Sequence, residues 1–271
     1  MANTIKLVYL LCIKEDFLYL KEEKMEKELE FYEKIGNWDF SKISYHEEII
    51  QDGFDYFKWI EKYTNEESIC LDLGTGGGEK VLEFYPKVRK IIGIDYSTQM
   101  IKSACENLNK SRRNTEDISF VQMDINDLKF EDNTFDVITA RHTVLNVNEI
   151  RRVLKPNGIL IIEGVAKDDA IKLKDIVGRG QCYFDEESIE ESDFHDLENA
   201  NFKFLENKMM LLNEWYHSKN DFMSLLFKAP IIENITNEDL KKIDEYINKN
   251  IELGNIKLVR QIYGFVCENI K

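Results

Sequence analysis

The order of apolar and polar positions divides the chain from Ser68 onward into short apolar runs separated by amphipathic segments. Short apolar runs are typical of buried strands, whereas apolar residues at helical spacing predict helices. The runs at 90–94 and 159–163 are almost continuously aliphatic, as in strands that helices cover on both faces. The predicted strands are Ile69–Leu73, Lys90–Ile94, Ile118–Met123, Val137–Ala140 and Ile159–Glu163.

Helices are predicted between these strands. Ser97 is a predicted N-cap, because its hydroxyl can accept a backbone hydrogen bond and apolar residues follow at helical spacing over 100–108. A short helix is predicted over Glu149–Leu154 and ends before Pro156. Because strands and helices alternate, we expect an α/β fold with a doubly wound, Rossmann-like sheet and helices on both faces.

The end of the chain follows a different order. Strands are predicted over Lys208–Tyr216 and Lys257–Cys267, and helices over Lys219–Phe227 and Asn237–Lys249. Late strands joined through helices can add antiparallel pairs, so we expect a mostly parallel sheet with an antiparallel final strand. Residues 185–198 carry eight acidic side chains in fourteen positions. Such a run indicates a solvated loop and the start of a helix, and a site for a cation or a basic partner is the alternative.

The N-terminal region divides into two predicted segments. The uninterrupted apolar run in the first segment, Leu7–Ile13, is too short for a membrane span of about 20 residues, and no signal peptide is evident. From Met25 the pattern becomes amphipathic and predicts an N-terminal helical lid. We expect the residues before Met25 to be dispensable for folding. The predicted boundaries are an extension at 1–24, the lid at 25–67 and the main domain at 68–271, with an elaboration at about 178–250.

Charge and cysteine content limit the classes of partner. The 271 residues carry a formal net charge of −15 and no cluster of basic residues, so nucleic acid is disfavoured as a partner. The five cysteines never form a C-x-x-C pair, so no zinc module is predicted and free thiols are expected. We therefore expect a cytoplasmic protein that binds neither a metal nor a membrane.

The most informative segment is the glycine-rich loop at residues 70–80, with the sequence CLDLGTGGGEK. Gly74, Gly76 and Gly78 lie between a predicted strand and a predicted helix, where glycine permits positive φ and the close approach of a ligand. The N-terminus of the following helix offers unpaired N–H groups and a partial positive charge. The loop therefore predicts a site for a dinucleotide pyrophosphate or for another cofactor that contains adenosine.

Two phosphate-binding patterns do not fit this loop. The dinucleotide pattern G-x-G-x-x-G requires a glycine where Glu79 stands, and the Walker pattern G-x-x-x-x-G-K-[ST] is absent. Asp72 lies inside the loop, where its charge would oppose a pyrophosphate but would suit an ammonium group. The pattern D-x-G-x-G-x-G resembles motif I of the class I S-adenosylmethionine-dependent methyltransferases.

Four further segments, in the order found in that family, extend the resemblance over residues 68–164. The turn before the last of them differs from the family pattern R-x-L-K-P-G-G, because Asn157 replaces the first glycine. Asp95 ends the second predicted strand, where a carboxylate accepts hydrogen bonds from ribose hydroxyls. The segments are IGIDYS at 92–97, FVQMDI at 120–125, FDVITAR at 135–141 and RVLKPNGIL at 152–160.

The resemblance implies S-adenosylmethionine as the cofactor and S-adenosylhomocysteine as its product. Asp124 is expected near the adenine amino group, with Ile125 against the ring. Tyr32 and Trp38 in the lid could place an aromatic face over the sulfonium, although core packing explains them equally well. The implied cofactor-binding residues are Asp72, Gly74, Thr75, Gly76, Gly78, Asp95, Tyr96, Asp124, Ile125, Arg141 and Tyr32.

The residues that would contact the methyl acceptor follow the fourth predicted strand and lie in later segments. Arg141, His142 and Asn146 follow the fourth predicted strand, where ligands of open α/β sheets bind. His142 is the candidate general base, because an imidazole titrates near pH 6.5, and a packing or hydrogen-bonding role at the rim is the alternative. Arg179 could hold a substrate carboxylate or only turn the chain. The remaining candidate histidines are His46, His195 and His217.

The resemblance also implies the reaction, which is methyl transfer. Methyl transfer from a sulfonium is an in-line displacement, so the protein has to align the acceptor, exclude water and supply a base where one is needed. The N/D-P-P-Y and Pro-Cys motifs, which indicate methylation of a base or an amide, are absent. We predict methyl transfer to oxygen or nitrogen of a small-molecule acceptor, with the elaboration at 178–250 on the substrate side. The alternatives are a methyltransferase of RNA or protein and a cofactor-binding domain without turnover.

Overall fold

The computed structural model of the chain describes residues 42–271, apart from residues 52, 114 and 115. The predicted extension at 1–24 lies outside the described residues, as do Tyr32 and Trp38 of the predicted lid.

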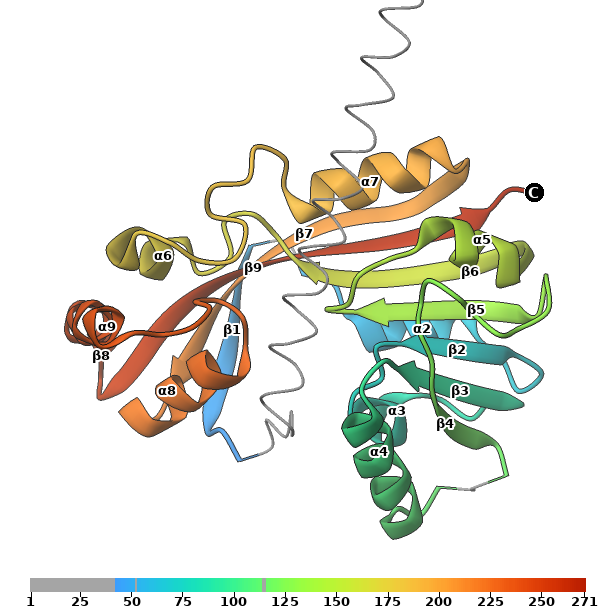
Figure 1. The fold of residues 1–271 in the computed structure, drawn as a ribbon, viewed down its shortest axis with the longest axis horizontal. Helices are drawn as coiled ribbons and strands as arrows, with labels where there is room; N and C mark the ends of the chain where they lie inside the picture. Colours follow the sequence, from blue (N-terminus) through green and yellow to red (C-terminus); the bar gives the residue numbers. More distant parts are fainter. Residues whose placement is uncertain (1–41, 52, 114–115) are drawn as a thin grey trace, which may run out of the picture. The chain divides into compact units, whose positions relative to one another are not determined.

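Five parallel strands form one half of a nine-stranded sheet (Figure 1). The first strand along the chain in this half, β2, lies in its middle, with β3 and β4 on one side and β5 and β6 on the other. Strand order therefore reverses between β2 and β5, and open α/β sheets bind their ligands beside such a reversal. The five strands are β2 (Ile69–Leu73), β3 (Lys90–Asp95), β4 (Ile118–Gln122), β5 (Phe135–Arg141) and β6 (Leu154–Val165).

The other half of the sheet is antiparallel. The long final strand β9 (Asn255–Asn269) pairs with β6 on one side and with β7 (Phe202–Tyr216) on the other. The two-residue strand β8 (Ile251–Glu252) pairs with β9, and β1 (Tyr45–Gln51) pairs with β7 at the sheet edge. This arrangement confirms the predicted α/β class, with a mostly parallel, Rossmann-like sheet and an antiparallel final strand.

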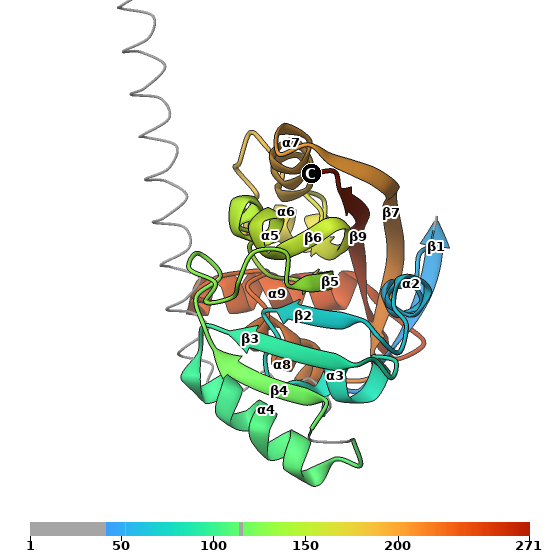
Figure 2. The same cartoon turned by 90° about the vertical axis from the view of Figure 1, so that its right-hand side faces the viewer.

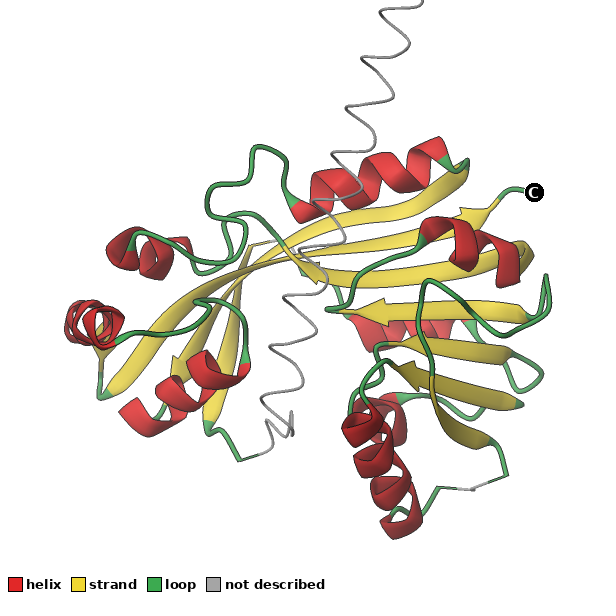
Figure 3. Ribbon diagram, viewed as in Figure 1, coloured by secondary structure: helices red, strands yellow, loops and turns green. Residues whose placement is uncertain are grey.

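Helices lie beside both faces of the sheet (Figure 3). The predicted cap at Ser97 is present, because its hydroxyl accepts a hydrogen bond from Met100 N at 3.3 Å. The acidic segment contains a helix whose capping box joins Ser188 and Glu191. The described helices are α2 (Tyr56–Tyr63), α3 (Glu79–Phe84), α4 (Thr98–Lys110), α5 (Val147–Val153), α6 (Ile171–Val177), α7 (Ile189–Asn199), α8 (Lys219–Lys228) and α9 (Asn237–Lys249).

Alternate residues of the parallel strands pack into two separate cores. On one face, Cys70, Val137 and Ile161 pack with apolar residues of α2, α3 and α4. On the other face, neighbouring strand residues such as Leu71 and Ile138 pack with apolar residues of α5 and α7. The face covered by α2 and α3 is also the face of Asp72, because side chains alternate along a strand.

The strands β7 and β9 continue beyond the parallel half and carry a third core. Tyr216 and Leu258 pack there against Leu173 of α6, Phe222 of α8 and Tyr246 of α9. Figure 2 shows that β7 and β9 bend along their length, with β1 beside β7. The predicted elaboration at 178–250 therefore contains four described elements, α7, β7, α8 and α9.

The described part of the predicted helical lid contains a strand as well as a helix. Residues 45–51 form β1, so the helical prediction is wrong over these positions, whereas α2 is helical. β1 forms by pairing with β7, a partner more than 160 residues away, and its sequence YHEEIIQ has no regular alternation. Among the described helices, none is sufficiently long and apolar to cross a membrane.

Candidate functional site

The glycine loop follows β2 and turns the chain into α3. Gly74, Gly76 and Gly78 have φ values of 67°, 55° and 73°, in the left-handed region that strains residues with a Cβ atom. Two backbone hydrogen bonds hold the loop: Thr75 N donates to Ile94 O at 2.9 Å, and Gly78 N donates to Thr75 O at 3.0 Å. The loop is therefore fixed against the end of β3.

The three glycines are required for different reasons. A Cβ atom at Gly74 would lie 2.7 Å from Thr143, and one at Gly78 would lie 2.6 Å from the Phe120 ring. A Cβ atom at Gly76 would meet no atom within 4 Å. Gly74 and Gly78 therefore allow close packing within the protein, whereas Gly76 borders space that a ligand can fill. This cradle fits the adenosine-containing cofactor implied by the sequence.

Asp95 stands at the end of β3, next to this cradle. Its Oδ2 accepts a hydrogen bond from Gly76 N at 2.9 Å, and its Oδ1 accepts one from Ser97 N at 2.9 Å. Burial raises the pKa of Asp95, although these two N–H groups oppose the rise. Each carboxylate oxygen has a further lone pair, so Asp95 is oriented to accept hydrogen bonds from a diol.

Asp72 lies beneath the loop and is engaged by the protein itself. Its Oδ1 accepts hydrogen bonds from Tyr85 OH at 2.6 Å and from Thr139 Oγ1 at 2.8 Å. The side chain is buried, and burial raises its pKa against the lowering effect of the Tyr85 and Thr139 hydrogen bonds. These contacts join the end of α3 to β2 and β5. A role of Asp72 toward the cofactor's ammonium group therefore remains a proposal.

The other expected adenosine contacts gather at the ends of β3 and β4. Tyr96 follows Asp95 and is exposed. Met123 N donates to Asp95 O at 3.0 Å, which places the segment after β4 beside the end of β3. In this segment, Asp124 and Ile125 are half-buried, and Asp124 Oδ1 accepts a hydrogen bond from Asn126 N at 2.8 Å.

Arg141 and His142 meet a third residue, Glu163, where β5 and β6 end. Glu163 Oε1 lies 2.6 Å from Arg141 Nε and 3.3 Å from His142 Nε2. Burial alone would raise the pKa of Glu163, but the charge of Arg141 and the contact with His142 outweigh burial and hold it at about 2. Burial, followed by the charge of Arg141, lowers the pKa of His142. At neutral pH the group therefore contains a carboxylate, a guanidinium and a neutral imidazole.

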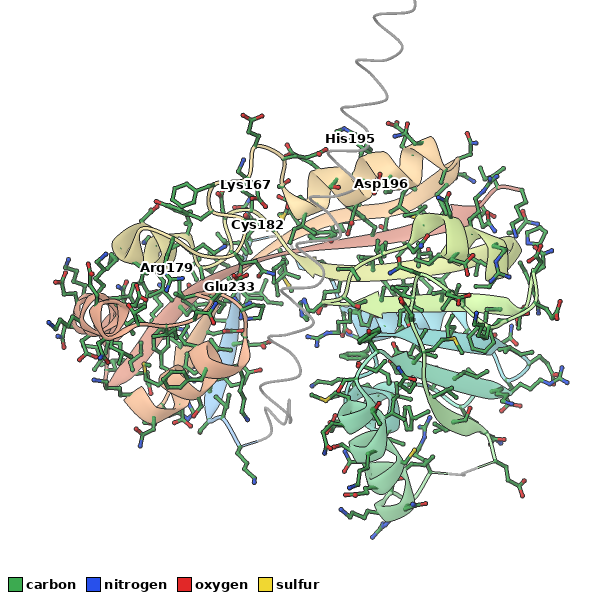
Figure 4. The ribbon with its side chains drawn as sticks, in the orientation of Figure 1. Lys167, Arg179, Cys182, His195, Asp196 and Glu233 are labelled. Carbon is green, nitrogen blue, oxygen red and sulfur yellow. The ribbon has the colours of Figure 1, made fainter. Side chains whose placement is uncertain are left out.

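The remaining predicted residues lie apart from the loop. Figure 4 shows Arg179 beside Glu233, and its guanidinium donates to Glu233 O at 2.6 Å and to Asp239 Oδ2 at 2.6 Å. Arg179 therefore holds this chain's own turn together. His195, on α7 in Figure 4, lies 3.0 Å from Glu187 Oε1 through its Nδ1.

His46 and His217 contact each other beside the sheet edge. His46 Nδ1 lies 3.0 Å from His217 Nε2, and His217 Nδ1 lies 2.6 Å from Ser44 Oγ. Asn146, the third residue expected at the rim, caps α5 by accepting a hydrogen bond from Glu149 N at 3.2 Å.

A buried ionic group near the site was not predicted. Arg260 on β9 donates to both oxygens of Asp169, at 2.7 and 3.1 Å, and to both oxygens of Glu214, each at 3.1 Å. All three side chains are buried. The sequence contains a signal that could have found this group, because Arg260 interrupts the apolar alternation of Ile256, Leu258 and Ile262.

Both a protein family and individual methyltransferases resemble this chain. A family model described as a methyltransferase domain matches residues 64–226, which is more than half of the chain. An uncharacterized methyltransferase of Bacillus subtilis, YcgJ, is 32% identical over 113 residues, which cover 39% of this chain and 44% of that protein. A 2-phytyl-1,4-naphtoquinone methyltransferase of Trichormus variabilis is 35% identical over 98 residues, which cover 32% of this chain and 42% of that protein. The chain therefore spans less than half the length of these relatives.

Solved structures resemble the fold across a larger part of the chain. A putative methyltransferase from Bacillus halodurans aligns with a TM-score of 0.59 at 18% identity, over 81% of this chain and 100% of that chain. The [4+2]-cyclase SpnF aligns with a TM-score of 0.53 at 20% identity, over 79% of each chain. At these identities the likeness concerns the fold, which proteins of different activity share. The family model and the ordered motifs together show that this chain belongs to the class I S-adenosylmethionine-dependent methyltransferase family.

Proposed function

We propose that this chain transfers a methyl group from S-adenosylmethionine to oxygen or nitrogen of a small-molecule acceptor. The observation that carries the proposal is the cradle at Gly76, where a Cβ atom would meet only open space, beside the oriented carboxylate of Asp95. Asp95 would hold the ribose hydroxyls, and Asp124 with Ile125 would hold the adenine. When bound, S-adenosylmethionine supplies an electrophilic methyl group on a sulfonium sulfur.

His142 and Glu163 offer a way to remove a proton from the acceptor. The lowered pKa of His142 keeps its imidazole neutral at pH 7, so one ring nitrogen can accept a proton. If Nε2 carries the hydrogen that faces Glu163 Oε1 at 3.3 Å, Nδ1 retains its lone pair. Glu163 would then stabilise the imidazolium that forms. We therefore propose His142 as the general base and Glu163 as the residue that positions it.

The small-molecule acceptor is supported by relatives and by charge. Related proteins include a 2-phytyl-1,4-naphtoquinone methyltransferase, whose name describes a small-molecule acceptor. The net charge of −15 works against a polyanionic acceptor such as RNA. We also propose a cytoplasmic location, because the thiols of Cys70 and Cys267 are buried and form no disulfide.

Calorimetry with three ligands tests the proposed function. We expect S-adenosylmethionine and S-adenosylhomocysteine to bind the full chain and NAD to release no heat. Tight binding of NAD without binding of either sulfur-containing ligand would overturn the proposal. Asp95→Ala provides the matched variant, because it removes the carboxylate at the cradle and should weaken the binding of S-adenosylmethionine and S-adenosylhomocysteine.

A further inference from the structure

The segment between β4 and β5 carries the two residues expected to hold the adenine, although it contains neither a helix nor a strand. It comprises residues 123–134, which we call the β4–β5 segment, and it consists of turns and irregular structure. Asp124 and Ile125 lie near its start. Because this segment has no regular backbone ladder, its conformation depends on hydrogen bonds to the elements beside it.

The start of the β4–β5 segment is a turn that orients Asp124. Met123 N donates to Asp95 O at 3.0 Å, so the segment leaves β4 beside the carboxylate proposed to hold the ribose. Asp124 Oδ1 accepts a hydrogen bond from Asn126 N at 2.8 Å, and Asp124 O accepts one from Asp127 N at 3.1 Å. The direction of the Asp124 carboxylate therefore depends on the position of Asn126.

Asn146, the N-cap of α5, contacts this turn. Its Nδ2 donates to Asn126 Oδ1 at 3.1 Å, while its Oδ1 accepts from Glu149 N at 3.2 Å. The amide therefore uses its oxygen for the helix and its nitrogen for the β4–β5 segment. The residues before the cap pack on the glycine loop, because a Cβ atom at Gly74 would lie 2.7 Å from Thr143. The chain that enters α5 thus contacts both the glycine loop and the turn after β4.

Two further residues of α5 hold the rest of the β4–β5 segment. Glu149 Oε2 accepts a hydrogen bond from Leu128 N at 2.9 Å. The Arg152 guanidinium donates to Leu128 O and to Phe130 O, each at 2.7 Å, and it forms a bidentate pair with the Glu149 carboxylate. Asn146, Glu149 and Arg152 follow one another at intervals of three residues, so neighbours lie on one side of the helix, and we call the three the α5 polar face.

Apolar packing supports the same arrangement. Leu128 is buried and packs in one core with Ile150 and Val153 of α5. The three side chains of the α5 polar face are half-buried against the β4–β5 segment. A displacement of Asp124 relative to α5 is therefore opposed by both hydrogen bonds and packing.

We propose that Asn146 is a positioning residue for the cofactor: through Asn126 it holds Asp124 in the direction that accepts a hydrogen bond from the 6-amino group of adenine. The rest of the α5 polar face fixes the segment that follows. The inference rests on the proposed binding of S-adenosylmethionine and adds the residues that set selectivity for adenine. It assigns Asn146, which the sequence placed among the residues of the acceptor side, to the cofactor side. A purine with an oxygen at position 6 would turn that oxygen toward the carboxylate and bind less tightly.

Two ligands that differ in the base test this selectivity. S-inosylhomocysteine carries an oxygen in place of the 6-amino group of S-adenosylhomocysteine and is otherwise the same apart from the hydrogen on N1. Each ligand is titrated by calorimetry into the full chain. We expect S-adenosylhomocysteine to bind at least about tenfold more tightly, because only its amino group can donate a hydrogen bond to the ionised Asp124.

Asn146→Ser separates the contact with Asn126 from the cap of α5. Serine caps a helix as well as asparagine does, so its hydroxyl can accept from Glu149 N, but its side chain is too short to reach Asn126. The Kd for S-adenosylhomocysteine should rise about 2- to 12-fold, because one hydrogen bond that orients Asp124 is lost. The Kd for S-inosylhomocysteine should change less, so the ratio of the two Kd values falls toward one. The Tm should change little, because the cap is kept.

Two further variants complete the comparison. Asn148→Ser makes the same substitution at an exposed residue of α5 and should leave both Kd values unchanged. Arg152→Lys keeps the positive charge beside Glu149 but lacks the planar fork that reaches two carbonyl oxygens, so it should reduce the affinity and the selectivity in the same direction as Asn146→Ser. It tests the α5 polar face independently of the helix cap.

The outcomes distinguish this inference from the proposed function. Selectivity that is unchanged in both Asn146→Ser and Arg152→Lys would overturn the inference, as would equal affinity of the unaltered chain for the two ligands. A parallel loss of affinity for both ligands in these variants would also overturn it, because such a loss reflects structure and not the reading of the base. Absence of binding of both ligands to the unaltered chain would overturn the proposed function, and the inference with it.

Discussion

Gly76 has two roles in the cofactor loop: it permits a positive φ, and it leaves space for a ligand. Substitution of Gly76 by valine tests these roles separately when it is compared with a second glycine variant. Gly76 has a φ of 55°, so valine would introduce backbone strain. Its Cβ atom would also enter the space that meets no protein atom within 4 Å. We therefore expect Gly76→Val to fold, to lose some stability, and to lose most of its affinity for S-adenosylhomocysteine.

The expected magnitudes follow from these two effects. The left-handed backbone costs an L-residue about 1–2 kcal/mol, which corresponds to a fall in Tm of roughly 2–8 °C in a chain of this size. Overpacking against a ligand costs about 1–3 kcal/mol, so the Kd for S-adenosylhomocysteine should rise about 5- to 150-fold. The loss of affinity therefore has a different origin from the loss of stability.

Gly178→Val is the matched control. Gly178 also has a positive φ, of 84°, and a Cβ atom there would also meet nothing within 4 Å. It caps the C-terminal end of α6, away from the cofactor loop. Gly178→Val should therefore lower Tm by a similar amount and leave the Kd unchanged.

Calorimetry gives the Kd for S-adenosylhomocysteine, and thermal unfolding gives the Tm, for the unaltered chain, Gly76→Val and Gly178→Val. The reasoning is refuted if Gly76→Val binds S-adenosylhomocysteine as tightly as the unaltered chain, because the space beside Gly76 would then not be the cofactor cradle. It is also refuted if Gly178→Val loses as much affinity as Gly76→Val, because the loss would then reflect strain alone.

Three further predictions concern the residues around the loop. Arg260→Met leaves two buried carboxylates without their partner, so the free energy of unfolding measured with urea should fall by about 3–5 kcal/mol, and a loss below 1 kcal/mol would contradict a structural role. Because the folded pKa of Glu163 is about 2 and its ordinary value is 4.5, its ionised form contributes stability above pH 4.5 that is lost as the pH falls toward 2. The stability difference between the unaltered chain and Glu163→Gln should therefore shrink over this interval, and a constant difference would argue against the ion pair. His142→Ala should keep its affinity for S-adenosylhomocysteine while kcat falls about 10²- to 10⁴-fold with an accepted substrate, and near-normal kcat would remove His142 from the mechanism.

The cofactor half of the site could be predicted because its signals are local. Positive φ at Gly74, Gly76 and Gly78 follows from a turn of a few residues between β2 and α3, and glycine is the residue that tolerates it. Asp95 could be placed because it directly ends an aliphatic strand. Within such short segments, the order of residue types is sufficient to predict the backbone conformation. The parallel strands, and the order of the motifs that follow them, were therefore predicted from the sequence.

The antiparallel half of the sheet depends on pairings between distant segments. Glu47 faces Glu214 across a register that joins positions 167 residues apart, and no local pattern encodes that register. The positions of Arg260 and Asp169 likewise require β9 and the segment before α6 to pack together.

The sequence by itself therefore determined a Rossmann-like sheet, a glycine loop and the carboxylate that accompanies it. Only the tertiary structure decided that β1 is a strand, that Arg141 and His142 share Glu163, and that Arg260 joins Asp169 and Glu214. The physical reason is that charge and burial act through space, so the chemistry of these side chains is set by neighbours that only the fold brings close.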